Sequence, residues 1–344
     1  MPELLVRRDD LATCELGEGE PPREDLGEGE AQLLVERFAL TTNNITYAVF
    51  GDMLGYWNLL PAPEGWGRIP AWGYARVTAS RAAGLPEGGR YFGIVPMGRH
   101  LTVRPAPGPA GFLDASPHRA KLSPVYNQYL PVQGEGQDAD PIMRPLFGTS
   151  VLLDLALDER EFHGAETVIL TSASSKTAYG LAHLLRDRPV RTVGLTSPSR
   201  RSWVADLGLY DQVLAYDDLS GLEAGGGAVL VDYTGDPALS GAVRERLAGA
   251  LAHAILVGFT HDREASDAAA PAGPEQEFFF APDEIVRRGR GFGLIYAEAW
   301  RSFAPVAERA LRIEHVTDGD GLLRVYRELL EGRVDPAVGY IVSL

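Results

Sequence analysis

The stretch that predicts the fold is residues 167–182, TVILTSASSKTAYGLA. It begins with a short β-branched apolar run, which is typical of a buried strand. A turn of small residues follows, and apolar residues then recur at helical spacing, including Ala178 and Leu181. Open α/β sheets bind a dinucleotide where a strand enters a helix through such a turn, because the turn amides and the positive end of the helix dipole face the pyrophosphate.

This turn lacks the glycines of the usual Gly-x-Gly-x-x-Gly pattern, and Ala173, Ser175 and Ala178 stand in their places. Alanine at the third place still lets helix and strand pack closely. Serine at the second place narrows the groove but adds a hydroxyl that can bind phosphate. We therefore predict a phosphate-binding turn, with the alternative that it only connects two elements. The predicted binding residues are Ser172, Ala173, Ser174, Ser175, Lys176 and Thr177.

The next predicted strand, residues 190–196, indicates which dinucleotide is bound. An acidic residue about 20 positions after the turn accepts the ribose hydroxyls in NAD-preferring enzymes. Here Thr196 and Ser197 occupy that place, and Arg200 and Arg201 follow. Hydroxyls and guanidinium groups would bind a 2′-phosphate that a carboxylate would repel. We predict NADP as the cofactor, bound there by Ser197, Ser199, Arg200 and Arg201; the alternative is the basic first turn of a surface helix.

Composition narrows the classes of partner. The chain has 344 residues and a formal net charge of −15, so nucleic acid and anionic membranes would be repelled. Cys14 is the single cysteine, which excludes an internal disulfide and a cysteine-based zinc cluster. No signal peptide and no apolar run near the length of a membrane span are evident. We expect a cytoplasmic protein that acts on a small molecule.

The chain divides into two parts with different patterns of predicted secondary structure. Short strands separated by Gly and Pro turns in the N-terminal part suggest a small β barrel, and a repeated Leu-Gly-Glu-Gly-Glu within residues 15–30 suggests a solvated acidic loop between two strands. From residue 141, strands alternate with helices, as in a parallel doubly wound sheet. We predict an α/β protein with a β-rich domain at 1–140, completed by 291–344, and a dinucleotide-binding domain at 141–290.

This order resembles the medium-chain dehydrogenase/reductase superfamily, and several segments carry the resemblance. Asn43-Asn44 with Tyr47 looks like its Gly-Val-Asn segment after the second strand. Residues 126–129 (YNQY) resemble the strand that completes the barrel, and residues 147–150 (FGTS) the helix whose threonine lies near the cofactor. Residues 330–336 (LEGRVDP) are similar to the closing Gly-Lys-x-x-Pro.

The resemblance implies a Rossmann-like sheet beside a GroES-like β barrel, and a homodimer is possible. The chain lacks the Gly-His-Glu segment of the zinc alcohol dehydrogenases and the cysteines of their zinc sites, so it is closer to the zinc-free quinone and enoyl reductases. The family lines its nicotinamide and ribose with strand ends. The residues that fall at such positions here, or near the cofactor, are Thr149, Tyr216, Asp232, Tyr233, Gly258 and Phe259.

Hydride transfer without a metal still needs a group that stabilises charge on the substrate oxygen. Tyr47 is the first candidate, as proton donor or oxyanion stabiliser; the alternative is an aromatic residue that packs a helix on the barrel. Asn44 could hold the substrate carbonyl or the nicotinamide amide, and its alternative is a helix cap. Asn127 is a weaker third candidate.

The seven histidines show no spacing typical of metal ligands, so no metal site is predicted. The sequence therefore predicts a zinc-independent NADP(H)-dependent oxidoreductase that reduces a carbonyl or an activated alkene of a small organic substrate. Two alternatives keep the scaffold: a nucleotide-responsive binding protein without hydride chemistry, and a non-redox enzyme such as a lyase.

Overall fold

The computed structural model describes residues 2–23, 25–257 and 273–344, and the chain divides into two compact units. Unit 1 comprises Met1–Pro145 and Leu311–Leu344, and unit 2 comprises Leu146–Ala310. Helix α2 (Ala139–Glu159) contains Pro145 at the boundary. Helix α7 (Phe292–Ala310) falls in unit 2, whereas the sequence analysis placed residues from 291 onward with the β-rich domain.

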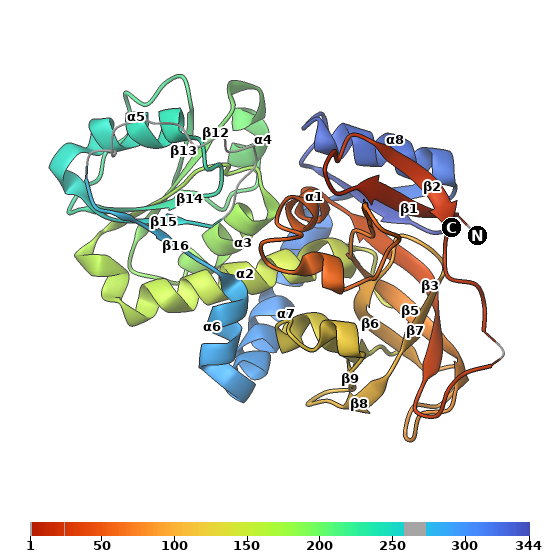
Figure 1. Ribbon diagram of the computed structural model, residues 1–344. Coiled ribbons are helices and arrows are strands. Elements are labelled where there is room, and N and C mark those ends of the chain that lie inside the picture. Colours follow the sequence, from red (N-terminus) through yellow and green to blue (C-terminus); the bar gives the residue numbers. More distant parts are fainter. Residues whose placement is uncertain (1, 24, 258–272) are drawn as a thin grey trace. The chain divides into compact units, whose positions relative to one another are not determined.

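Unit 2 is built on a parallel sheet (Figure 1). Its strands and further helices are β11 (Thr167–Leu170), α3 (Lys176–Leu185), β12 (Arg191–Thr196), α4 (Arg201–Asp206), β13 (Gln212–Ala215), β14 (Ala228–Asp232), α5 (Pro237–Leu247), β15 (Leu251–Leu256), β16 (Gln276–Phe278) and α6 (Ala281–Arg288). In the described part of the chain the strand order is β13-β12-β11-β14-β15-β16, with every neighbouring pair parallel. The direction of winding therefore reverses between β11 and β14, which makes their carboxyl ends the topological switch point.

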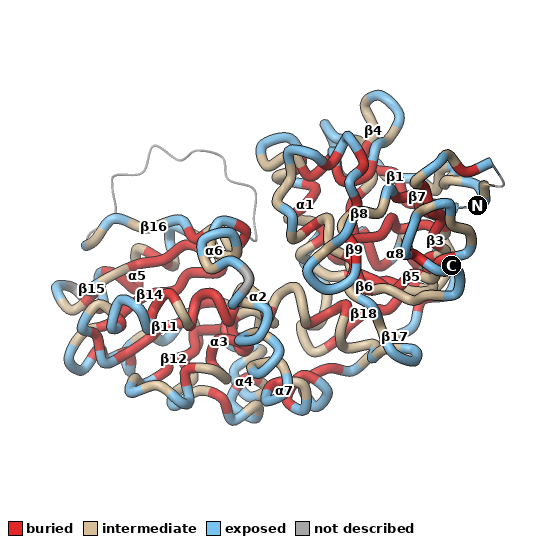
Figure 2. The backbone as a smooth tube through the Cα atoms, turned by 90° about the horizontal axis from the view of Figure 1, so that it is seen from below, coloured by how far each residue is buried: buried red, intermediate tan, exposed pale blue. Residues whose placement is uncertain are grey.

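Helices cover both faces of this sheet. Val243 and Leu247 of α5 pack with buried strand residues such as Ile169 and Leu195 on one face. On the other face α2 lies directly on α3, and Gly180 is required for this approach because a Cβ there would lie 2.7 Å from Oγ of Ser150. Strands β11 and β14 are buried along their whole length, whereas β16 at the sheet edge is partly exposed (Figure 2). Continuous apolar runs are typical of such central parallel strands.

Unit 1 is mainly antiparallel. Its elements are β1 (Pro2–Arg7), β2 (Cys14–Glu18), β3 (Ala31–Leu40), α1 (Thr42–Val49), β4 (Trp66–Gly67), β5 (Ala71–Ser80), β6 (Arg90–Val95), β7 (His100–Val103), β8 (Pro105–Pro107), β9 (Phe112–Asp114), β10 (Gln128–Pro131), β17 (Arg312–Val316), α8 (Gly319–Leu330) and β18 (Val338–Val342). In the order β17-β18-β3-β5-β6-β10-β9-β8, the C-terminal strand β18 pairs with β3 and β17 pairs with β18, so the chain end completes this sheet.

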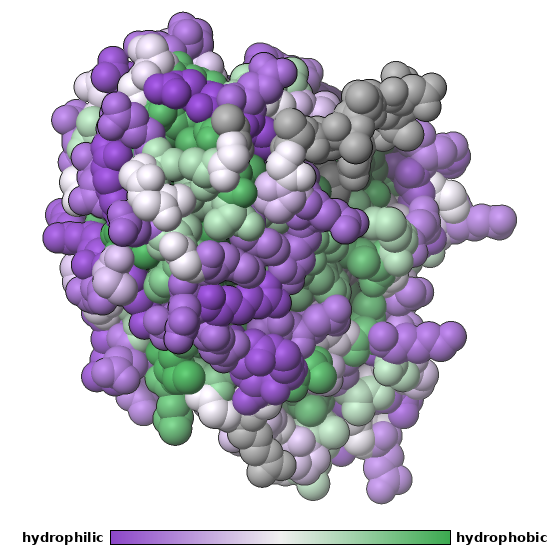
Figure 3. Space-filling model, turned by 90° about the vertical axis from the view of Figure 1, so that its left-hand side faces the viewer, coloured by the Kyte–Doolittle hydropathy of each residue, from purple (hydrophilic) through white to green (hydrophobic). Residues whose placement is uncertain are grey.

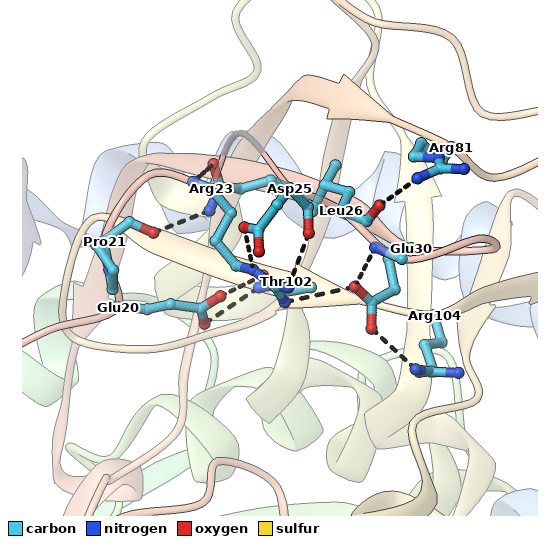
Figure 4. A network of polar contacts seen from close by, with 11 residues as sticks. Glu20, Pro21, Arg23, Asp25, Leu26, Glu30, Arg81, Thr102 and Arg104 are labelled. Atoms are coloured by element: carbon cyan, nitrogen blue, oxygen red, sulfur yellow. Dashed lines mark hydrogen bonds and ion pairs between the residues drawn. The ribbon is translucent and has the colours of Figure 1, made fainter.

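The acidic run between β2 and β3 is a loop, as expected, but two of its carboxylates are turned onto the barrel (Figure 4). Glu20 accepts hydrogen bonds from the amide and hydroxyl of Thr102. Glu30 accepts from the Gly27 amide at 2.9 Å and forms an ion pair with Arg104 at 2.9 Å. The last glutamate of each repeat therefore fixes the loop, which corrects the expectation of a purely solvated run.

The predicted elements of unit 2 are present with one clear correction. The helix expected over 239–252 ends at Leu247, because Leu251 begins β15 and pairs with β14. At this position the burial of the strand decides the secondary structure, because helix propensity is only a weak preference that tertiary packing can override. The face of the molecule in Figure 3 carries mainly hydrophilic side chains with smaller hydrophobic patches between them, in agreement with the charged composition.

Candidate functional site

Two polar side chains join the strands at the switch point. The hydroxyl of Thr171, directly after β11, donates to Oδ1 of Asp232 at the end of β14 (2.8 Å) and accepts from the amide of Tyr233 (2.8 Å). The same carboxylate oxygen accepts from the amide and hydroxyl of Thr234. Asp232 is almost fully buried, so its carboxylate acts within the fold. We predicted that Asp232 contacts a cofactor, but in the structure its carboxylate instead positions the two strand ends.

The turn after β11 is bonded to a residue of β12 and to a residue that follows β13. Ser172 has a positive φ of 47°, and its amide donates to the hydroxyl of Tyr216, which follows β13 (2.9 Å). The Ala173 amide donates to the carbonyl of Leu195 in β12 (2.9 Å), and the Ser175 amide closes the turn on the Ser172 carbonyl (2.7 Å). The turn therefore has a defined shape, held by strands far away in the sequence.

The first turn of α3 is capped by the chain itself. Ser175 is the N-cap residue, and its hydroxyl accepts from the Ala178 amide at 3.3 Å. From α2, the hydroxyl of Ser150 donates to the Thr177 carbonyl at 2.8 Å. Thr149, a predicted cofactor residue, lies beside Ser150 on α2 and is partly exposed. Helix α2 therefore borders the turn, as the resemblance implies for the helix that carries this threonine.

These bonds determine which turn donors remain for a ligand. The amides of Ser172, Ala173, Ser175 and Ala178 are engaged within the protein. In the described part of the chain no acceptor contacts the amides of Ser174 and Thr177. Both lie at the N-terminus of α3, where the helix dipole favours an anion.

The residues predicted to contact a 2′-phosphate gather at the carboxyl end of β12. The hydroxyls of Ser197 and Ser199 lie 3.2 Å apart, and both residues are at least partly exposed. Arg200 is the N-cap residue of α4, and Arg201 is its first residue. The Nε of Arg201 donates to the Val213 carbonyl (3.3 Å), which holds this exposed guanidinium beside β13.

Two tyrosines complete the surroundings of the turn. Burial raises the pKa of Tyr216 and of Tyr233 above their ordinary value. The Tyr233 hydroxyl is buried and has no hydrogen-bond partner among the described residues. Both phenols are therefore neutral near pH 7 and can act as hydrogen-bond donors. The predicted residues Gly258 and Phe259 lie outside the described residues.

The catalytic candidates lie in unit 1. The Tyr47 hydroxyl on α1 accepts from Nε1 of Trp72 at 3.0 Å. Its ring contacts those of Tyr56 and Tyr126, with centroids 4.9 and 6.1 Å away. Burial is the main cause that raises the pKa of Tyr47. A phenol that accepts a hydrogen bond and stays protonated has its own proton to donate.

The two asparagine candidates have other partners in the structure. Oδ1 of Asn44 accepts from the amide of Thr41, the N-cap of α1 (2.7 Å), and its Nδ2 donates to the carbonyl of Pro70 (2.8 Å). Asn44 therefore caps the helix, which is the alternative to a substrate contact that the sequence left open. Nδ2 of Asn127 contacts the carbonyl of Arg119 at 3.4 Å, while its Oδ1 has no hydrogen-bond partner in the described chain.

Several residues that shape the sites were not singled out from the sequence. Thr171 and Ser150 have hydroxyls on the strand end and helix beside the turn. Tyr210 donates to the carbonyl of Ala173 at 2.8 Å, although it lies 37 positions further along the chain. A polar residue directly after a buried strand was a usable signal for Thr171, but no local pattern indicates Tyr210.

Among the described residues, no cluster of three His, Cys, Asp or Glu side chains is arranged to hold a metal ion. Within those same ranges, no helix has the length and apolar character required to span a bilayer.

A doubly wound parallel sheet with its switch point at β11 and β14, together with a mainly antiparallel unit that the C-terminus completes, defines the predicted class of fold. The predicted fold class is therefore confirmed, and solved structures share this fold. The particular family is the one described as "Protein of unknown function (DUF2855)", to which this chain belongs, since the match covers residues 38–335. No curated protein matches the sequence.

Solved structures with the same fold match over the whole chain. CurA from Vibrio vulnificus in complex with NADPH is 13% identical with a TM-score of 0.69, and the match covers 100% of this chain and 99% of that one. A mutant form of enoyl thioester reductase from Candida tropicalis is 10% identical with a TM-score of 0.62, covering 100% and 99%. The quinone oxidoreductase from Thermus thermophilus, also solved with NADPH, is 20% identical with a TM-score of 0.56, covering 100% of both chains.

Proposed function

We propose that this chain is an NADPH-dependent reductase that acts without zinc on a carbonyl or an activated alkene of a small organic substrate. The observation that carries the proposal is the turn at the switch point of the parallel sheet. It joins β11 to α3, it is bonded to residues in or directly after β12 and β13, and it keeps the Ser174 and Thr177 amides for a ligand. Open α/β sheets bind dinucleotides at this place.

The residues present fit the pyrophosphate of such a cofactor. The Ser174 and Thr177 amides lie at the start of a ten-residue helix, where their donors would add to the helix dipole. Lys176 places a positive charge in the same turn. The chain's net charge of −15 would otherwise repel an anion, so a local concentration of donors and positive charge is required.

The residues after β12 support NADPH over NADH. Two serines and two arginines follow β12, and no carboxylate occurs between Thr196 and Arg201. A guanidinium binds a phosphate through parallel charge-assisted hydrogen bonds. CurA and the Thermus quinone oxidoreductase, which share the fold, were both solved with NADPH.

When bound, NADPH would supply the hydride. The chain's own residues then have to bind the substrate and give its oxygen or carbon a proton. Tyr47 suits this task because its hydroxyl accepts a hydrogen bond from Trp72 and keeps its own proton. Asn44 has a positioning role, since its amide fixes the start of α1, which carries Tyr47. Asn127 remains a weaker candidate for substrate contact. The proposal includes a cytoplasmic homodimer.

Titration with NADPH and NADH, followed by nicotinamide fluorescence, tests the proposal. We expect saturable binding that is tighter for NADPH, and oxidation of bound NADPH by at least one quinone, enone or aldehyde from a panel. Binding without oxidation by any of them would favour the nucleotide-responsive binding protein. No binding of either cofactor would contradict the proposed function.

A further inference from the structure

Ser172 adopts a backbone conformation that serine rarely adopts. Its φ of 47° lies in the left-handed region, where Cβ approaches the following carbonyl and where glycine is preferred. Most of the residues with positive φ in the described chain are glycines. Such a conformation persists only where the surrounding structure holds it. The turn therefore needs support from outside its own sequence.

Two tyrosine hydroxyls contact the turn on either side of the Ser172–Ala173 peptide bond. Tyr216 accepts from the Ser172 amide at 2.9 Å, and Tyr210 donates to the Ala173 carbonyl at 2.8 Å. The first bond requires an acceptor and the second a donor, and a phenol can be either. The two tyrosines flank β13, which is separated from β11 by β12, so both bonds come from the two ends of one strand.

A glycine in β12 makes room for this arrangement. A Cβ at Gly194 would lie 2.8 Å from the ring of Tyr210 and 2.9 Å from Cβ of Ala173. A side chain there would therefore push the ring and the turn apart. Burial raises the pKa of Tyr210, which keeps its proton on the hydroxyl that donates to Ala173.

We propose that Tyr210 and Tyr216 form a clamp that holds the serine turn in its left-handed, phosphate-binding conformation. The clamp supports a positive φ at Ser172, which directly precedes the first of the three glycine places of the usual Gly-x-Gly-x-x-Gly turn. Tyr210 is a positioning residue, because it acts on a ligand only through the turn. The consequence for NADPH affinity rests on the proposed function, whereas the consequence for the turn itself does not.

Amide hydrogen exchange of the ligand-free protein tests the clamp directly. Tyr210→Phe and Tyr216→Phe retain the rings and remove one hydrogen bond each. We expect the amide of residue 172 to exchange at least about tenfold faster in both variants, because losing a buried hydrogen bond of this kind corresponds to about that factor. Exchange in α5 should stay unchanged, which shows that the variants are folded.

Rescue by glycine separates a clamp from general packing. In a Ser172→Gly background, Tyr210→Phe should change exchange and NADPH affinity by less than about twofold, because glycine adopts positive φ without support. In the Ser172 background the same change should weaken NADPH binding about fivefold to tenfold, through the smaller population of the competent turn. Ser174→Gly is the matched control, and it should not rescue, because Ser174 is not among the positive-φ residues.

The outcomes distinguish the clamp from the proposed function. Unchanged exchange at residue 172 in both Phe variants, or equal losses with and without Ser172→Gly, would overturn the clamp even if the wild-type chain binds NADPH. Faster exchange with glycine rescue in a protein that binds no NADPH would support the clamp and contradict the proposed cofactor.

Discussion

The hydroxyl of Thr171 lies 2.8 Å from Oδ1 of Asp232, and this hydrogen bond joins the carboxyl ends of β11 and β14 where the sheet reverses its winding. Both residues are almost fully buried. The bond therefore connects the strand that leads into the serine turn with the first strand of the other half of the sheet.

Removing the Thr171 hydroxyl should destabilise the protein. Thr171→Val preserves shape but leaves the buried Asp232 carboxylate and the Tyr233 amide with one partner fewer. We expect a loss of about 1–3 kcal/mol in the free energy of unfolding, measured by urea denaturation. Ser220→Ala, which removes a similar bond from the exposed Asp218, is the matched control and should cost less than about 0.5 kcal/mol. Equal losses would contradict the special role of the switch point.

The arginine pair should determine cofactor preference. Arg200→Ala combined with Arg201→Ala removes two positive charges from the end of β12, and we expect NADPH affinity to fall about 10- to 100-fold, because each charge-assisted contact contributes about 1.5–3 kcal/mol less its solvent screening. NADH affinity should change little. Arg246→Ala, at an exposed arginine bonded to the Leu219 carbonyl, is the control. An equal loss for both cofactors would refute the 2′-phosphate role.

Tyr47 should affect turnover and leave cofactor binding intact. With any substrate that the panel identifies, Tyr47→Phe should lower kcat about 100-fold, a typical contribution of a positioned acid, while NADPH affinity stays within about twofold. Because burial raises the pKa of Tyr47, this loss should be constant between about pH 6 and pH 9, where the phenol is protonated. Tyr91→Phe, at a half-buried tyrosine on β6, is the control. An unchanged rate would remove Tyr47 from the mechanism.

Stability should fall with rising pH because of Glu3. Burial raises the pKa of this carboxyl from 4.5 to about 7, despite its ion pair with Arg68 at 3.1 Å. Between these two values the folded chain binds more protons than the unfolded chain. The stability that Glu3 contributes is therefore complete below pH 4.5 and is lost as pH rises through 7.

Glu3→Gln removes this titration and should flatten the profile. We expect the variant to gain up to about 3 kcal/mol over the wild type between pH 5 and pH 8, since each unit of pKa shift corresponds to about 1.4 kcal/mol. Urea unfolding at both pH values measures the difference. Glu18→Gln on the neighbouring exposed strand position is the control. Parallel profiles for wild type and Glu3→Gln would contradict the effect of Glu3.

Local patterns predicted the elements well. The apolar run at residues 167–170 and the spacing of Ala178 and Leu181 are sufficient for a buried strand and its following helix, and β11 and α3 are found there. The alternation of strands and helices after residue 141 predicted the doubly wound sheet for the same reason. Periodicity of apolar side chains is a property of adjacent residues, so it can be read without knowledge of the fold.

Hydrogen-bond partners could not be predicted in this way. Asn44 looked available to a substrate, but its amide bonds the carbonyl of Pro70, 26 positions away. The Ser172 amide belonged to the predicted phosphate site, yet it is engaged by Tyr216, 44 positions away. The sequence shows that donors are present in a segment, whereas only the folded chain shows which of them are already satisfied.

The sequence alone determined the order of strands and helices, because this order depends on neighbouring residues. It also shows the serines and lysine of the turn and the lack of a carboxylate between Thr196 and Arg201. The tertiary structure decided that the side chains of Asp232 and Asn44 form hydrogen bonds within the fold, and that the amides of Ser172 and Ser175 are engaged by other residues of the protein. A polar group's role depends on which partner satisfies it in the folded state. Those partners come from strands and loops that are distant along the chain and adjacent only after folding.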